Sequence, residues 1–149
     1  MTEVLFYHLE KQPLERVLPR LIAKTLERGW RAVVQAGSEE RVEAISAALW
    51  VSGEESFLPH GTARDGNGDL QPVWITDKDE TPNGANVCFL VDRARTDDFA
   101  AFQRVVYLFD GNDAEAVEQA RRAWKSAQAA GRAVTYWRED PQGRWQKQA

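Results

Sequence analysis

Residues 104–138 read RVVYLFDGNDAEAVEQARRAWKSAQAAGRAVTYWR, a segment whose pattern predicts a strand, a helix and a second strand in succession. The apolar run Arg104–Phe109 predicts a strand. The alanine-rich segment from about Asn112 to Ala130 predicts a long helix, with Gly131 placed to cap its C-terminus. Its acidic residues come early and its basic residues late, which is the order that suits the helix dipole. A second strand is expected at Ala133–Arg138.

The same alternation of strands and helices runs through the rest of the chain. We expect strands at Glu3–Leu9, Arg31–Ala36, Val73–Thr76 and Val87–Val91, helices at Pro13–Arg28 and from Ser38 to about Trp50, and one or two helical turns at Asp97–Phe102. In the first helix, Pro19 favours a kink or a late start. The N-cap of the second helix is expected to be Ser38.

This alternation predicts one α/β domain over residues 1–149, with a mainly parallel sheet covered by helices on both faces. Two segments lie outside the pattern. The glycine-rich stretch 51–72 is expected to be a long loop, and 140–149 a turn followed by a tail or a short returning strand at Arg144–Lys147.

Composition limits the classes of function. The 149 residues include 19 Lys plus Arg against 23 Asp plus Glu, a formal charge of -4, which argues against a general duplex-DNA binder. The single cysteine, Cys88, excludes an internal disulfide and a multi-cysteine zinc site. No apolar run approaches the roughly 20 residues that span a bilayer, and no basic region precedes the first apolar stretch. We therefore expect a cytoplasmic protein without membrane contact.

Motifs for catalysis or cofactor binding are missing from the sequence. No glycine-rich phosphate loop follows the first strand, although the fold class is similar to nucleotide-binding folds. The DGNGD run at 65–69 resembles the start of a calcium loop, but Leu70 and Thr76 stand where glycine and glutamate are required. We expect no catalytic residues, cofactor or metal. The alternative is a small nucleotide-binding or enzymatic domain that uses the C-terminal edge of the sheet.

Two clusters of side chains suggest partner binding. The first comprises Trp50, at the edge of the apolar stripe of its helix, and the SFLPH segment with Phe57, Pro59 and His60. Clustered exposed aromatic groups mark binding surfaces. The alternative is that Trp50 and Phe57 only seal the loop against the body of the domain.

The second cluster lies on the last helix and comprises Arg121, Arg122, Trp124 and Lys125. Helical spacing places Arg121, Trp124 and Lys125 along one edge, a plausible cradle for an acidic peptide. The alternatives are that Trp124 belongs to a core stripe with Val117, and that the basic residues are a solvated helix end.

These residues carry a resemblance to a known family. FYHLE at 6–10, ALW at 48–50, ESFLPHG at 55–61 and PVWIT at 72–76 resemble the chi subunit of bacterial DNA polymerase III, as do VVYLFDGND at 105–113 and RRAWK at 121–125. ESFLPHG and the Arg–Trp helix are the most diagnostic of these segments. The order and spacing extend the similarity over nearly the whole chain.

The resemblance implies a non-catalytic accessory protein of the replication machinery. Chi proteins pair with the psi subunit, which tethers them to the clamp loader, and in some bacteria an XPD-like helicase takes the same face. They also bind the acidic, phenylalanine-ending C-terminal tail of single-stranded DNA-binding protein. A chain of this family therefore contacts DNA only indirectly.

The resemblance also implies roles for particular residues. Trp50, Phe57 and Pro59, with His60 beside them, match the positions that face psi or the helicase. Arg121 matches the arginine that holds the tail, Trp124 stands where relatives have tyrosine, and Lys125 matches a basic neighbour. Some relatives have a further lysine where this chain has Val117, which makes the expected tail pocket less basic here.

Overall fold

The computed structural model describes residues 2–51, 59–96 and 99–148. Three α-helices lie in these ranges: α1 (Leu14–Glu27), α2 (Glu39–Val51) and α3 (Ala114–Ala129). The strands described are β1 (Glu3–Leu9), β2 (Ala32–Gln35), β3 (Gly61–Thr62), β4 (Val73–Thr76), β5 (Val87–Leu90), β6 (Arg104–Asp110), β7 (Ala133–Glu139) and β8 (Trp145–Lys147). Short 3₁₀ turns occur at Gly68–Leu70 and Phe99–Ala101.

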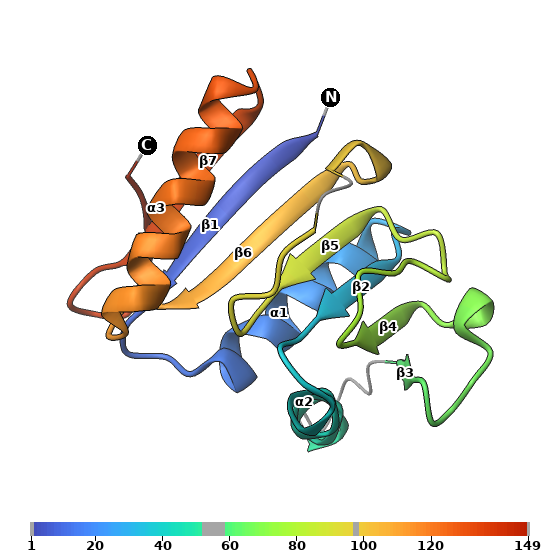
Figure 1. Ribbon diagram of the computed structural model, residues 1–149. Coiled ribbons are helices and arrows are strands. Elements are labelled where there is room, and N and C mark those ends of the chain that lie inside the picture. Colours follow the sequence, from blue (N-terminus) through green and yellow to red (C-terminus); the bar gives the residue numbers. More distant parts are fainter. Residues whose placement is uncertain (1, 52–58, 97–98, 149) are drawn as a thin grey trace.

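Over the described residues, the strands form one eight-stranded sheet in the order β3-β4-β2-β5-β6-β1-β7-β8 (Figure 1). Every pairing from β3 to β7 is parallel, and β8 alone returns antiparallel to β7. The predicted α/β fold with a mainly parallel sheet is therefore confirmed. In the register of this sheet, Phe6 of β1 lies between Tyr107 of β6 and Tyr136 of β7.

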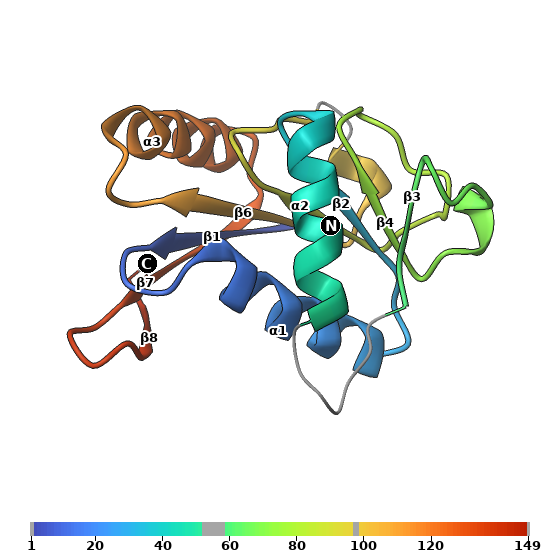
Figure 2. The ribbon, with the colours of Figure 1, turned by 90° about the horizontal axis from the view of Figure 1, so that it is seen from below.

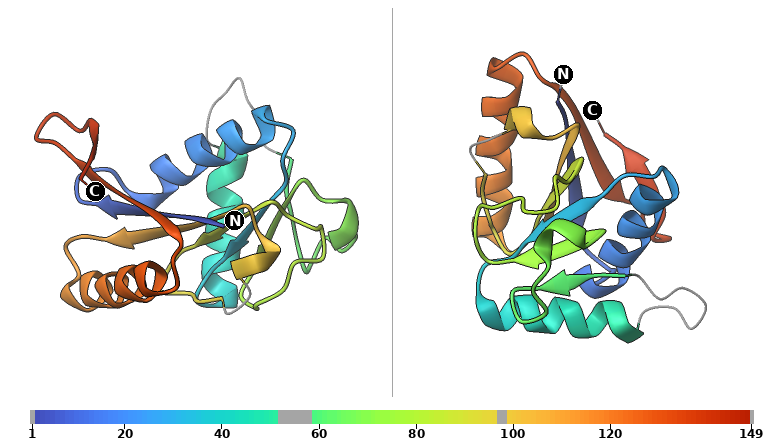
Figure 3. Two further views of the ribbon diagram at one scale, coloured as in Figure 1. Left: turned by 90° about the horizontal axis from the view of Figure 1, so that it is seen from above. Right: turned by 90° about the vertical axis from the view of Figure 1, so that its right-hand side faces the viewer.

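The helices cover both faces of the sheet, and each face has its own apolar core. Helices α1 and α2 pack on one face, through a cluster that includes Leu18, Ile45 and Val34. Helix α3 packs on the opposite face, where its alanines meet Val4, Phe6 and Phe109. Figure 2 shows α3 and α1 on opposite sides of β1 and β6. The hairpin of β7 and β8, at one edge of the sheet, bends toward the side on which α1 lies (Figure 3).

Local predictions differ from the structure at two places. The late start suggested for the first helix is wrong, because α1 already begins at Leu14 and continues across Pro19. Pro19 is buried next to the contact between α1 and α2, and this apolar burial offsets the missing backbone hydrogen bond. The long loop predicted at 51–72 contains a strand, β3, whose two residues extend the sheet beside β4.

The C-terminal segment forms the returning strand that was one of two expectations. The turn at Asp140–Gly143 is closed by a hydrogen bond from the amide of Gly143 to the carbonyl of Asp140, at 2.9 Å. Gly143 adopts a φ of +81°, which glycine tolerates without strain. Strand β8 then pairs Lys147 with Trp137 and Trp145 with Glu139.

Candidate protein-binding site

Helix α3 is held close to the sheet by small residues. Asp113 caps its N-terminus, and its side chain accepts hydrogen bonds from the amides of Glu115 and Ala116 at 3.0 and 3.4 Å. Ala116, Ala120 and Ala127 are buried against β1, β6 and β7. Because alanine takes little space, the neighbouring Arg121 and Trp124 are brought near the sheet as well.

Trp124 is half-buried and belongs partly to the core. Its ring meets Phe6 edge-on at a centroid distance of 5.6 Å and Tyr136 edge-on at 5.7 Å. Such edge-to-face contacts stabilise aromatic clusters beyond the area they bury. The stripe predicted to include Trp124 is present: Ala120 and Ala127 are buried, while Val117 and Trp124 are half-buried at its margin. Trp124 therefore packs against the core through Phe6 and Tyr136, beneath the exposed residues of α3.

Arg121, Arg122 and Lys125 are exposed and border one hollow on α3, together with Val117, Glu118 and Gly111. Among the described residues, none of the three cations has a carboxylate within ion-pair distance. The prediction that Arg121 and Lys125 share an edge agrees with this placement, but Trp124 is not part of the hollow lining. Unpaired cations beside an apolar side chain are able to hold a carboxylate and an apolar group together.

Two further residues, Tyr136 and His8, lie beside Arg121 and were not foreseen from the sequence. The Tyr136 hydroxyl is 2.7 Å from Nδ1 of His8, and Nε2 of His8 is 3.1 Å from Glu10. Burial raises the pKa of Tyr136, while the charges of Arg138 and Arg121 oppose this rise. His8 lies on β1 and Tyr136 on β7, and the pairing of these two strands brings the residues together. Local spacing along the sequence could not predict this contact.

The other predicted surface is described only in part. Trp50 lies in the last turn of α2, and Phe57 falls outside the described residues. Pro59 is exposed. His60 is half-buried and lies 3.0 Å, through Nε2, from the hydroxyl of Ser46 on α2. His60 is therefore held against α2, the helix whose last turn contains Trp50.

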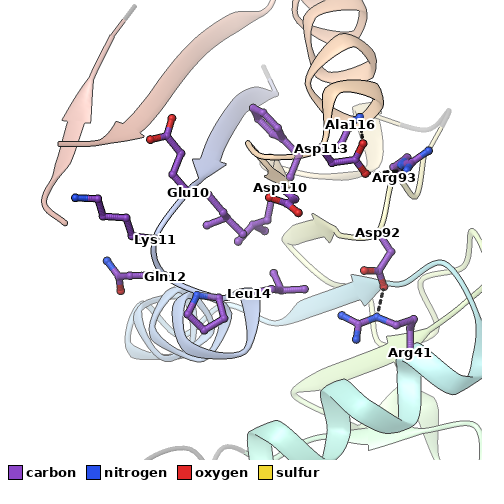
Figure 4. Close-up of a pocket in the computed structure, with 14 residues that line it drawn as sticks. Glu10, Lys11, Gln12, Leu14, Arg41, Asp92, Arg93, Asp110, Asp113 and Ala116 are labelled. Carbon is purple, nitrogen blue, oxygen red and sulfur yellow. Dashed lines mark hydrogen bonds and ion pairs between the residues drawn. The ribbon is translucent and has the colours of Figure 1, made fainter. Parts of the chain in front are cut away.

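A separate cavity of about 810 Å³ opens at the carboxyl ends of β1 and β6, between the N-termini of α1 and α3 (Figure 4). This is the edge at which α/β proteins commonly bind nucleotides. Its lining combines acidic and basic side chains: Glu10, Asp92, Asp110, Asp113, Lys11, Arg41 and Arg93. The cavity is thus the place to test the nucleotide-binding alternative.

The chain's own groups already engage the three cations that line this cavity. Arg41 pairs with Asp92 at 3.0 Å, and Arg93 pairs with Asp113 at 2.8 Å (Figure 4). Lys11 donates to the carbonyl of Pro141. Asp113 also occupies the amides at the N-terminus of α3, the position that a phosphate would need. The cations of α3, by contrast, have no carboxylate partner among the described residues.

The ranges that the structure describes contain neither a cluster of metal ligands nor a membrane-spanning helix. Within them, no three His, Cys, Asp or Glu side chains are gathered as metal ligands. None of the helices found there combines the length and the apolar character that a membrane crossing requires.

Fold and site together define an α/β domain whose helix α3 exposes Arg121, Arg122 and Lys125 near the half-buried ring of Trp124. The family model described as DNA polymerase III chi subunit, HolC, matches residues 1–135. The chain therefore belongs to the DNA polymerase III chi subunit family. It is also similar to a probable DNA polymerase III subunit chi from Rickettsia prowazekii (strain Madrid E), with 28% identity over 91 residues. That alignment covers 61% of this chain and 55% of the relative's length.

Proposed function

We propose that this chain is a non-catalytic accessory subunit of the replicative DNA polymerase, acting in the cytoplasm. In this role it links the clamp loader, through psi, to the acidic C-terminal tail of single-stranded DNA-binding protein. The observation that carries the proposal is the set of unpaired cations, Arg121 and Lys125, beside Trp124 in a chain of the chi family.

The tail is held by two kinds of contact. Its carboxylates pair with the exposed guanidinium of Arg121 and the ammonium of Lys125. Its terminal phenylalanine ring packs on the apolar surface that the half-buried Val117 and Trp124 leave open. The single carboxylate bordering the hollow, Glu118, opposes an acidic ligand and is outnumbered there by three cations. Binding weakens as salt is added, since exposed ion pairs are screened.

Calorimetry with an acidic peptide ending in phenylalanine tests the tail site. Arg121→Ala removes a charge-assisted contact and should weaken binding by about 1–3 kcal/mol, roughly 5- to 150-fold. Lys24→Ala, an exposed cation on α1 across the sheet, is the matched control and should bind normally. Equal affinity of Arg121→Ala and the unaltered protein would refute the assignment.

For the second partner, we propose that Trp50, Phe57, Pro59 and His60 face psi or an XPD-like helicase. Trp50→Ala or Phe57→Ala should abolish co-purification with that partner while leaving the melting temperature nearly unchanged. Leu70→Ala is the control, since Leu70 is 67% exposed and lies in the 3₁₀ turn at Gly68–Leu70, beyond β3. If both aromatic variants unfold instead, the two side chains serve to seal the loop.

The competing function is a nucleotide-binding or enzymatic domain that uses the cavity between α1 and α3. A thermal-shift screen of nucleotides against the tail peptide separates the two functions. We expect the peptide to raise the melting temperature and the nucleotides to leave it unchanged, because Arg41 and Arg93 are already paired. If a nucleotide raised the melting temperature and the peptide did not, the nucleotide-binding function would be favoured instead.

A further inference from the structure

A groove on the opposite face from α3 has a chemistry that the proposed tail site does not use. It lies between α1 and the hairpin of β7 and β8. That hairpin bends to the same side of the sheet as α1 (Figure 3). The volume of the groove is about 370 Å³. Its floor is apolar sheet surface, formed by Leu5, Phe89 and Val106. We call it the α1–hairpin groove.

Two aromatic residues, Tyr7 on β1 and Trp137 on β7, line the α1–hairpin groove, and Trp145 adjoins Tyr7. Tyr7 and Trp137 are paired across β1 and β7, and their rings lie nearly parallel, 9° apart with centroids 6.3 Å from each other. Trp145 of β8 meets Tyr7 edge-on at 5.2 Å. All three residues are half-buried, so part of each is open to solvent. A half-covered aromatic shelf of this kind is a platform for a planar group.

Cations border the same groove on both sides. Lys24 on α1 and Lys147 on β8 are exposed, and neither has a carboxylate at ion-pair distance among the described residues. At the far end, the guanidinium groups of Arg28 and Arg104 lie 5.2 and 5.5 Å from the ring centre of Trp30. The one acidic side chain in the lining, Glu3, is bound to Arg104 at 2.8 Å.

The basic border continues along α1. Arg20, Lys24 and Arg28 are all exposed and recur every four residues. At 1.5 Å per residue, they form a row of about 12 Å along the helix. The chain as a whole has a formal charge of -4, so this row of cations beside aromatic rings is a local exception to its net charge. The local charge favours an anionic partner that also carries planar groups.

We propose that the α1–hairpin groove binds single-stranded nucleic acid. The phosphates follow Lys24, Arg28 and Lys147, and an unpaired base packs on the shelf of Tyr7 and Trp137. Proteins that hold single strands combine a basic track with aromatic rings in this way. A duplex would keep its bases stacked inside, so no base would be free to pack on the aromatic shelf. An acidic peptide with one terminal ring would leave most of the aromatic shelf unused.

The proposal goes beyond the link to the protein tail, because the chain would then contact the single strand itself. Its test is fluorescence anisotropy of the full chain with a labelled single-stranded oligothymidylate of roughly 15 nucleotides, at about 50 mM salt. The double variant Lys24→Gln and Lys147→Gln removes the two unpaired cations without touching the core. We expect at least fivefold weaker binding, and a salt dependence reduced by about 1.4 in log–log slope, from two phosphate contacts.

Matched controls separate this groove from the tail site. Arg121→Gln with Lys125→Gln removes the same charge on the opposite face and should leave oligonucleotide binding intact while weakening the tail peptide. Trp137→Leu should weaken the oligonucleotide through lost stacking, with circular dichroism to verify folding. The proposal is overturned if the unaltered protein does not bind the oligonucleotide, or if both double variants lose it equally. It is also overturned if the groove variant loses the tail peptide instead.

Discussion

At the scale of single residues, His8 connects the core to the candidate tail site. Its ring is buried between Phe109 and Tyr136, and Nδ1 accepts a hydrogen bond from the Tyr136 hydroxyl. The carboxylate of Glu10 can only accept, so Nε2 carries the proton. Burial lowers the pKa of His8, the charge of Arg138 adds to this, and Glu10 opposes it. His8 is therefore neutral at pH 7.

The lowered pKa of His8 predicts how stability depends on pH. Below its unfolded pKa of about 6.5, the unfolded chain binds a proton that the folded chain resists, so stability falls as the pH drops from about 7 toward the lowered folded pKa. His8→Gln should flatten this part of the profile. Melting temperatures of both proteins between about pH 5 and pH 7.5 provide the measurement. Parallel profiles would show that another group is responsible.

Cys88 gives a second prediction at this scale. The thiol is 1% exposed on β5, and burial raises its pKa to about 12, so the reactive thiolate is scarce in the folded protein. We expect a colorimetric thiol reagent at about pH 8 to label the native chain only at the rate of unfolding. Urea should restore fast labelling, and fast labelling of the folded chain would contradict the burial of Cys88.

At the scale of elements, α3 depends on its first turn. Asp113 caps the helix and also pairs with Arg93, and these hydrogen bonds lower the pKa of its carboxyl group. Asp113→Ala should lower the melting temperature by a few degrees, whereas Asp113→Asn keeps a capping oxygen and should recover most of the loss. The difference between alanine and aspartate should shrink at acidic pH, as the lowered pKa is reached. Thermal melts of the unaltered protein and both variants, at a neutral and an acidic pH, measure these differences in melting temperature.

The elements themselves were predictable from local pattern. The strands at Glu3–Leu9 and Val73–Thr76 agree residue for residue with expectation, and α3 lies inside the predicted helix. Ser38 does cap α2, since its hydroxyl accepts from the amide of Arg41 at 3.2 Å. The two-residue strand β3 was not predictable, because it is too short to show a period and depends on β4 for its hydrogen bonds.

At the scale of the whole molecule, Phe6 joins the sheet to α3. It is fully buried, stacks on Tyr107 at 4.8 Å and supports Trp124 edge-on. Phe6→Ala leaves a cavity under the candidate tail site and should cost about 3–5 kcal/mol of unfolding free energy. Urea unfolding measures this cost, with exposed Leu70→Ala as the control that should change little. A loss below about 1 kcal/mol would mean that the core closes around the gap.

The candidate site was predictable only in part. Arg121, Trp124 and Lys125 were found from helical spacing and from the family resemblance, both of which are visible along the chain. Spacing could not tell that Trp124 packs on Phe6 while Arg121 and Lys125 border the hollow, since that depends on how α3 sits on the sheet. Nor did it reveal the partners of Trp137 and Trp145, which line or adjoin the α1–hairpin groove.

The alternation of strands and helices, the α/β class and the chi family follow from the sequence alone, because apolar periodicity and motif order are properties of neighbouring residues. Which distant side chains meet depends instead on the tertiary structure. Pairing of β1 with β7 brings His8 to Tyr136 across 128 positions, and folding of α1 beside the hairpin brings Lys24 and Lys147 to one groove. Such contacts follow from strand order, which no local pattern encodes.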